Sequence, residues 1–391
     1  MAYITVRQGP IYYQMTFEDI LNGPVDVSKI FVSNNANTRT HYAKYLTQTF
    51  LEKFNINGMI SLLESFNERC EALGLFAAER HSLYRKFFIP KKSGGLRPIN
   101  APNDTLMKAL RDLKDIFEKD MFALYHTSAF AYAKERSTVL ALARHQQNQS
   151  KWFLKLDFHD FFGSTTPEFL YRQLASIFPF SEVAKNPKGE VNLRKALSLC
   201  FLDGGLPQGT PISPMLTNLM MIPIDHVLSN ILRDFEYVCS FNGNTHKRRF
   251  VYTRYADDMI ISSRDYFEFK KVIELIKTTL LSFNAPFELN EKKTRYGSSS
   301  GSNWNLGLML NRENNITVGH MKKRTFKAMC NNYICDKKNG KDWPLEDVQS
   351  FDGTRSYYKK IEPETVGYII NHYNNTYGVD LEKMIREDLT K

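Results

Sequence analysis

The sequence contains few cysteines, and their arrangement excludes a disulfide-based fold. Its five cysteines are odd in number and scattered through the 391 residues, whereas small disulfide-rich scaffolds place an even number at regular spacings. Cys330 and Cys335 lie close together, but no second cysteine pair or pair of histidines stands at the spacing of a zinc site. We therefore expect reduced thiols and an ordinary hydrophobic core.

Long apolar runs are also missing. No segment approaches the roughly 18 uninterrupted apolar residues that a membrane helix requires. The first ten residues, MAYITVRQGP, lack the basic region and apolar core of a secretory signal. We therefore expect a cytoplasmic protein without a membrane partner.

The charge balance is positive. Lysine and arginine number 52 against 42 aspartates and glutamates, which gives a formal net charge of +10, while 42% of the residues are hydrophobic and 24% charged. Such a composition and length indicate a globular chain of two to three domains. The basic excess suits a polyanionic partner and salt-dependent binding, although charge alone does not separate this from a merely soluble basic surface.

Two adjacent carboxylates stand between two strand-forming runs. Apolar and β-branched residues flank the tetrapeptide YADD at residues 255–258, within FVYTRYADDMIISS. This pattern predicts a β-hairpin with Asp257 and Asp258 at its tip. Because neighbouring carboxylates repel each other, the pair calls for a cation, and Mg²⁺ prefers such oxygen ligands. A solvated acidic turn explains this motif equally well when it is considered alone.

A third carboxylate follows another strand candidate. The run KWFLKL at residues 151–156 is mostly apolar and leads directly into Asp157. An acid at the end of this strand, beside a hairpin that carries two more, would supply three carboxylates. Two-metal centres of this composition hold ions about 3.5–4 Å apart and stabilise the attacking and leaving oxygens of an in-line displacement.

Five motifs, in this order, resemble those of reverse transcriptases. They are residues 94–99 (GGLRPI), Asp157 with Phe162 five residues later, residues 205–209 (GLPQG), residues 255–258 (YADD) and residues 290–294 (NEKKT). The stretches VYTRYADD and ITVGH are similar to bacterial retron and defence-associated enzymes. The resemblance implies an α+β right-hand polymerase fold with fingers, a palm of antiparallel sheet with helices packed on one face, and an α-helical thumb.

The resemblance also implies catalytic roles. Asp157, Phe158, Asp257 and Asp258 would form the metal site and hold two Mg²⁺ ions, or Mn²⁺ in their place. Lys293 would assist the departing pyrophosphate, in preference to its neighbour Lys292.

Binding roles follow in the same way. The nucleotide-binding residues would be Lys91, Arg97, Asp160, Phe162, Gln208 and Gly209; the primer grip would include Leu306 and Gly307, and the thumb would bind nucleic acid through Lys322, Lys323 and Arg324. A bulky aromatic at the position of Phe162 packs where a ribose 2′-OH would sit, which predicts deoxynucleotide use. A core phenylalanine, a helix cap at Asp160, a solvated basic turn at Lys91 and a solvated basic thumb face are the structural alternatives.

Apolar periodicity and the motifs together predict the organisation of the chain. We expect an N-terminal helical extension over residues 1–80, fingers over 81–150, a palm over 151–310 with part of the fingers inserted around 163–204, and a thumb over 311–391. Helices are predicted at 42–54, 57–73, 104–122 with Asp104 as N-cap, 137–147, 212–232, 266–283, 363–375 and 380–389. The Pro-, Lys- and Gly-rich residues 178–192 are predicted to form a surface loop.

The expected function is RNA-directed DNA polymerisation. The resemblance favours a stand-alone bacterial enzyme that copies a small structured, co-encoded non-coding RNA into DNA during antiphage defence, with dNTPs and a DNA primer or product as partners. Asn-Ala-x-x-His is missing before the GLPQG loop, and Asn305-Leu306-Gly307 replaces the Val-Thr-Gly of retrons, so a typical retron RNA is not expected. A protein-primed or template-independent DNA polymerase and a non-catalytic RNA-binding scaffold are the alternatives. The oligomeric state is left open.

Overall fold

A computed structural model describes residues 55–90, 94–121, 125–239, 243–299 and 307–390, together with the backbone of the paired strands β1 (Tyr3–Thr5) and β2 (Tyr12–Gln14). The expected helix at 42–54 and the residues Lys91 and Leu306 lie outside this part of the chain. Two compact units are formed, one by Met1–Arg136, Leu154–Ile261 and Phe267–Arg295, the other by Ser137–Phe153, Ser262–Tyr266 and Tyr296–Lys391. Each unit is described by itself.

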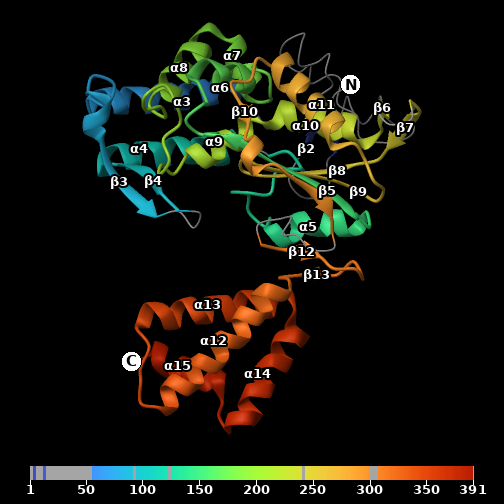
Figure 1. Cartoon of the computed structure of the whole chain (residues 1–391). Helices are drawn as coiled ribbons and strands as arrows, with labels where there is room; N and C mark the ends of the chain where they lie inside the picture. The colour runs from blue at the N-terminus through green and yellow to red at the C-terminus, as the bar shows by residue number, and fades with distance from the viewer. Residues whose placement is uncertain are drawn as a thin grey trace. The chain divides into compact units, whose positions relative to one another are not determined.

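A small antiparallel sheet carries the acidic motifs (Figure 1). Its strands are β5 (Trp152–His159), β8 (Val251–Tyr255), β9 (Asp258–Ser263), β10 (Glu288–Leu289) and β11 (Arg295–Ser298). The order is β10-β5-β9-β8, and β11 also pairs with β5. The amide of Lys151 bonds to Ser263 while that of Phe158 bonds to Asp257, so β5 and β9 run in opposite directions. Asp157 is thereby placed on the strand next to the YADD hairpin, as predicted.

Helices surround this sheet in the larger unit. They are α3 (Ile56–Ala72), α4 (Asp104–Asp115), α6 (Pro167–Leu174), α7 (Phe180–Lys185), α8 (Pro187–Ser198), α9 (Ser213–Met220), α10 (Ile222–Arg233) and α11 (Phe269–Ser282). α10 packs against both β8 and α11, and Figure 1 shows both helices on the same side of the strands. The amphipathic pattern that predicted α11 buries Val272, Ile276 and Leu280.

Three local predictions are wrong. Residues 178–192 form α7 and the start of α8 instead of a loop, because Asn186 caps the amides of Lys188 and Gly189 and because Phe180 and Val183 are buried. The predicted helix at 212–232 is broken into α9 and α10, which are bent by 45° where Pro223 enters the first turn of α10. The N-cap of α4 is Asn103, not Asp104, which occupies the first turn.

Two short β-ribbons extend the larger unit. β3 (Tyr84–Pro90) and β4 (Leu96–Pro102) pair antiparallel, with Arg97 opposite Ile89. β6 (Phe235–Val238) and β7 (Thr245–Arg248) form the second ribbon, just before the YADD hairpin. Most side chains of β3 and the first half of β4 are exposed, whereas Tyr237 of β6 is buried.

Helices dominate the smaller unit. α12 (His320–Lys338), α13 (Leu345–Ile361), α14 (Pro363–Tyr377) and α15 (Leu381–Leu389) share a core that includes Phe326, Tyr333 and Phe351. The helix α5 (Thr138–Gln147) contacts the short pair β12 (Met309–Leu310) and β13 (Ile316–Thr317). The predicted helices at 137–147, 363–375 and 380–389 are confirmed within about two residues.

Within the described residues, no single helix has the length and apolarity needed to cross a membrane. α9 and α10 pass that test only as a bent pair, and most of their side chains are buried.

Candidate active site

A buried arginine, Arg254, is hydrogen-bonded to the backbone of the YADD turn. Ala256 adopts a left-handed backbone conformation with φ 57°, which places the turn between β8 and β9. Arg254 donates a hydrogen bond from Nη1 to the Ala256 carbonyl at 3.0 Å. Its Nε and Nη2 donate to both carboxylate oxygens of Asp225 on α10. The turn that carries the two acids is therefore held by side chains that lie completely inside the protein.

Three carboxylates gather at this turn. Asp157 and Asp258 are 5% and 9% exposed, and the Asp257 carbonyl accepts a bond from the amide of Phe158 at 3.4 Å. Burial raises the pKa of Asp257, and the charges of Asp157 and Asp258 raise it further. Burial also raises the pKa of Asp258, although Lys155 opposes the shift. The three acids therefore act on one another and form one negatively charged centre.

Two lysines neutralise part of this charge. Lys293 Nζ lies 2.9 and 3.1 Å from the two oxygens of Asp157, and the hydrogen bond raises the pKa of the lysine. Lys155 Nζ lies 2.9 Å from Asp258 Oδ1. Lys155 is not among the site residues predicted from the sequence. The sequence does contain a signal for it. Side chains alternate between the two faces of a strand, so Lys155, two residues before Asp157 on β5, lies on the same face of the sheet as that carboxylate.

The donor set fits a divalent cation that the substrate helps to bind. No group of three or more acidic, histidine or cysteine side chains within the described ranges is arranged to hold a metal ion by itself. Mg²⁺ in phosphoryl-transfer sites usually takes only one or two carboxylates and completes its shell with phosphate oxygens and water. The mutually repelling Asp257 and Asp157 meet that requirement. Phe158 has no ligand atom in its side chain, and its buried ring stacks on Phe161.

The expected nucleotide-binding segments meet at the ribbon formed by β3 and β4. The Asn100 amide on β4 donates to the Gln208 carbonyl at 2.8 Å. Gly209 has φ 116°, and a Cβ there would lie 2.8 Å from Ile99 Cγ2 and 3.0 Å from the Asn100 carbonyl oxygen. Only glycine therefore permits this close approach. Arg97 stands exposed on the same strand.

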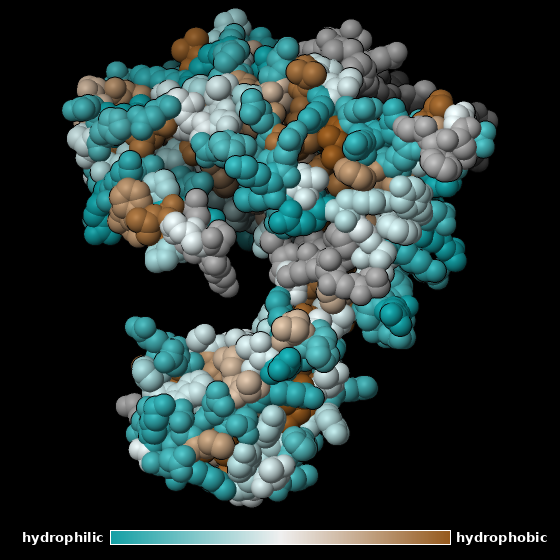
Figure 2. All heavy atoms as spheres, in the orientation of Figure 1, coloured by the Kyte–Doolittle hydropathy of each residue, from teal (hydrophilic) through white to brown (hydrophobic). Residues whose placement is uncertain are grey.

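Exposed apolar side chains cover the outer part of this ribbon. Phe88, Ile89 and Leu96 are 55%, 44% and 58% exposed, and Figure 2 shows hydrophobic spheres at the position of β3 and β4. Beside them, the Lys86 ammonium lies 5.8 Å from the ring centroid of Phe88. Aromatic and cationic groups together suit nucleic acid, which offers base faces and phosphates.

Phe162 and Asp160 lie in the turn after β5. Phe162 is half-buried, and its carbonyl accepts a bond from the Leu206 amide at 2.9 Å, so the expected sugar discriminator lies beside the GLPQG loop. Asp160 has φ 43°, and its carboxylate folds over Gly163, where a Cβ would come within 2.2 Å. Thr166, not Asp160, caps α6, which removes the capping alternative for Asp160.

The thumb residues are partly engaged within the smaller unit. Lys322 Nζ donates to the Gly307 carbonyl at 2.7 Å, which joins the start of α12 to the expected primer grip. Lys323 pairs with Glu362 at 2.9 Å, whereas Arg324 is exposed. Arg324 is therefore the most accessible of the three cations.

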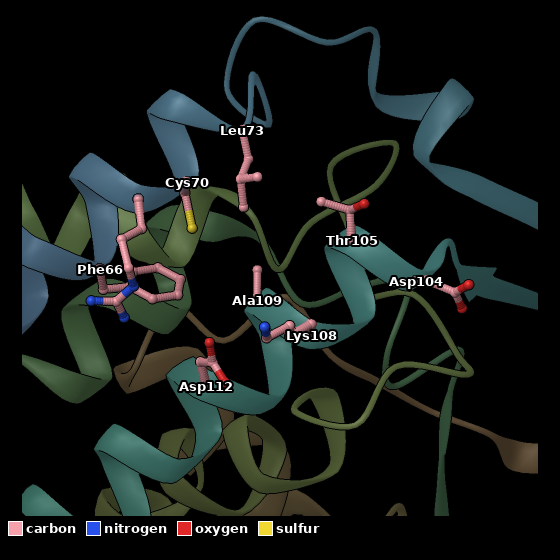
Figure 3. Close-up of a pocket in the computed structure, with 9 residues that line it drawn as sticks. Phe66, Cys70, Leu73, Asp104, Thr105, Lys108, Ala109 and Asp112 are labelled. Carbon is pink, nitrogen blue, oxygen red and sulfur yellow. The ribbon is translucent and has the colours of Figure 1, made fainter.

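A separate pocket lies between α3 and α4 (Figure 3). Its volume is about 400 Å³. Phe66 and Cys70 on α3 face Lys108 and Asp112 on α4. None of the expected site residues lines it, so it does not belong to the carboxylate centre.

Comparison with known protein families places most of the chain in one of them. Residues 89–328 match the family model described as reverse transcriptase (RNA-dependent DNA polymerase). The chain therefore belongs to the reverse transcriptase family, and the α+β polymerase fold with fingers, palm and thumb is confirmed.

Individual relatives make the resemblance more specific. The chain is 28% identical over 286 residues to the retron Ec73 reverse transcriptase of Escherichia coli, which covers 71% of this chain and 83% of the relative. It is 25% identical over 313 residues to the retron Ec83 enzyme of the same species, with coverage of 78% and 90%. The similarity to retron reverse transcriptases is thus confirmed, and the chain is an RNA-directed DNA polymerase.

Solved structures include a more distant neighbour. Telomerase from Candida albicans with a fragment of telomeric RNA aligns with a TM-score of 0.41 and 12% identity over 78% of this chain and 63% of that chain.

Proposed function

We propose that this polymerase copies a small structured, co-encoded non-coding RNA into DNA by two-metal nucleotidyl transfer, in bacterial antiphage defence. The observation that carries the chemistry is the centre formed by Asp157, Asp257 and Asp258 with its two lysines. Similarity to retron enzymes over more than two thirds of the chain supports an RNA template and a bacterial setting. The defence role rests on the resemblance of the motifs.

Asp157, Asp257 and Asp258 would hold two Mg²⁺ ions at the turn. When bound, such ions activate a primer hydroxyl and neutralise charge on the triphosphate. The buried hydrogen bonds of Arg254 keep the turn in position, so the carboxylates need little reorganisation before the reaction.

Basic side chains would act on the triphosphate. Arg97 is exposed on β4 and its planar guanidinium can bind phosphate oxygens in a bidentate manner. Lys293 reaches the centre from beside Asp157, where its ammonium could stabilise and protonate the leaving pyrophosphate. Phe162 would fill the space beside C2′ and exclude a ribose hydroxyl.

The test starts from the protein as it exists in a bacterial host with its neighbouring genes. The tagged chain is purified, and its nucleic acid is extracted and sequenced beside that of a variant with Asp257→Ala and Asp258→Ala. We expect a discrete RNA in both samples and complementary DNA only with the wild-type protein. Phage plaque counts should fall with the wild-type protein and not with the variant.

Other outcomes would contradict parts of the proposal. DNA that stays attached to protein after denaturation and is released by protease would indicate protein priming. DNA without a complementary RNA would indicate template-independent synthesis. Phage protection by the double variant would exclude a role of polymerisation in defence.

A further inference from the structure

Residues 128–130 belong to none of the sequence motifs, but they are hydrogen-bonded to β8, the strand that leads into the YADD turn. Ala129 pairs in parallel with Arg254 of β8. The Arg254 amide donates to the Ser128 carbonyl at 2.7 Å, and the Phe130 amide donates to the Arg254 carbonyl at 2.8 Å. Residues 128–130 therefore extend the sheet edge beside the YADD hairpin, and their position is tied to that of the catalytic turn.

Two side chains outside β8, Asn218 and Arg136, also form hydrogen bonds to the backbone of this loop. Asn218 of α9 donates a hydrogen bond from Nδ2 to the Ala131 carbonyl at 2.7 Å. The guanidinium of Arg136 donates to the carbonyls of His126 and Ala129. Ala129 and Ala131 are completely buried. These bonds leave the backbone little freedom up to residue 131.

Tyr132 projects from this rigid segment. Its side chain is 51% exposed, although the residues just before it are buried. Its φ of 57° lies in the left-handed region, which a bulky non-glycine residue adopts only where its surroundings impose it. Strain of this kind concentrates at binding and catalytic sites. The backbone of Tyr132 is therefore strained in the conformation that exposes its aromatic ring.

Tyr132 follows the segment that pairs with Arg254, and Arg254 in turn holds the Ala256 carbonyl of the catalytic turn. Partial burial raises the pKa of the phenol, the charges of Asp257 and Tyr255 raise it further, and Arg97 lowers it. The phenol is therefore neutral at physiological pH. Under the proposed function Asp257 would help to hold the metal ions and Arg97 the triphosphate, and the charges of both side chains act on the phenol of Tyr132.

We propose that the ring of Tyr132 packs against the base and sugar of the incoming deoxynucleoside triphosphate. The inference rests on the proposed function, which places the nucleotide between Arg97 and Asp257. An aromatic face suits every base, because stacking needs no particular hydrogen-bond pattern. The backbone that leads to the ring is already held by the bonds to Arg254 and Asn218, so little backbone ordering is needed when the nucleotide binds.

The test is single-nucleotide addition by the full chain to a DNA primer on an RNA template, at varied dNTP concentration. We expect Tyr132→Ala to raise KM for dNTP by about tenfold, with a much smaller change in kcat. Tyr132→Phe keeps the ring and should behave as wild type. Tyr368→Ala removes a ring that is 71% exposed on α14 and should change neither constant.

Distinct results would overturn the inference or its basis. If the wild-type protein adds nucleotides and Tyr132→Ala has the same KM for dNTP, the proposed contact of Tyr132 with the nucleotide is wrong. The proposed function is not affected by that result. A loss of kcat in Tyr132→Phe would show that the hydroxyl, not the ring, matters. If Tyr132→Ala does not fold, Tyr132→Leu keeps the bulk without the aromatic face and should still raise KM. A wild-type chain that adds no nucleotide would overturn the proposed function and the inference together.

Discussion

Arg254 and Asp225 form an ion pair that is completely withdrawn from solvent. The Nη2 and Oδ2 atoms are 2.7 Å apart, and both side chains are 0% exposed. Tyr252 donates its hydroxyl to Asp225 Oδ1 at 2.7 Å, and Asn218 Oδ1 accepts from Arg254 at 3.4 Å. Because Arg254 also holds the Ala256 carbonyl, this network connects α9 and α10 to the catalytic turn.

Breaking this pair should destabilise the fold strongly. Asp225→Ala leaves the guanidinium of Arg254 buried without its counter-ion, which costs about 3–5 kcal/mol. Urea unfolding of both proteins measures the loss. The control is Glu236→Ala, since Glu236 and Lys247 are 3.6 Å apart with both side chains more than half exposed, and such pairs contribute at most ~1 kcal/mol. A comparable, small effect of both substitutions would contradict the assigned importance of the buried pair.

The sequence could not reveal this network. Arg254 stands on a strand next to an acidic motif and reads as a surface cation, while its partner is 29 residues away on another element. Only the tertiary packing of α10 on β8 brings the two together. The ion pair of Lys155 with Asp258 also depends on tertiary packing, because Asp258 comes from the neighbouring strand, although strand alternation alone places Lys155 on the face of Asp157.

Other parts of the fold were accessible from local patterns. The β-branched runs around Asp257 and the apolar spacing of α11 predicted their elements, since each pattern matches one periodicity over many residues. The loop prediction for residues 178–192 was wrong because α7 is only six residues long. A helix of that length is too short to show an apolar periodicity. Its burial depends on contacts with α3 and α8, which no local pattern encodes.

Lys293 should matter for catalysis and its neighbour should not. We expect Lys293→Ala to lower kcat for nucleotide addition by roughly 10²-fold, the lower end for loss of a positioned proton donor. Lys292→Ala is the matched control, because that lysine is exposed and one residue away. Primer extension with saturating dNTP gives both rates. Equal losses in the two variants would indicate a general charge effect instead of a specific contact.

Phe162 should set the sugar preference. Its position is fixed by the bond from Leu206 to its carbonyl, so removing the ring opens a space that a 2′-hydroxyl can fill. We expect Phe162→Val to reduce discrimination against ribonucleotides by about 10- to 200-fold, the range typical of small steric differences in a pocket. Addition of dATP and ATP opposite the same template base provides kcat/KM for each. Unchanged discrimination with normal dATP use would show that Phe162 serves only the core.

The acidic centre should make the metal-free protein less stable as the pH rises. Burial and the neighbouring acids raise the pKa of Asp257 above its usual value of 3.8 in the folded state. The folded protein therefore binds this proton more readily than the unfolded chain, and the associated stability is present below pH 3.8 and is lost as the pH rises through the folded-state pKa. Asp257→Asn removes the charge, so it should raise Tm relative to wild type at pH 7 and lose that advantage near pH 3.8.

Thermal unfolding in EDTA, and separately in buffer with Mg²⁺, tests whether Asp257 destabilises the metal-free protein and binds the cation. Mg²⁺ should raise the Tm of the wild-type protein more than that of Asp257→Asn, because binding to the folded state alone stabilises it and the variant loses a carboxylate ligand. Equal Tm values for both proteins at pH 7 in EDTA would contradict a raised pKa of Asp257 in the folded protein. An equal response to Mg²⁺ would show that Asp257 does not contribute to the cation site.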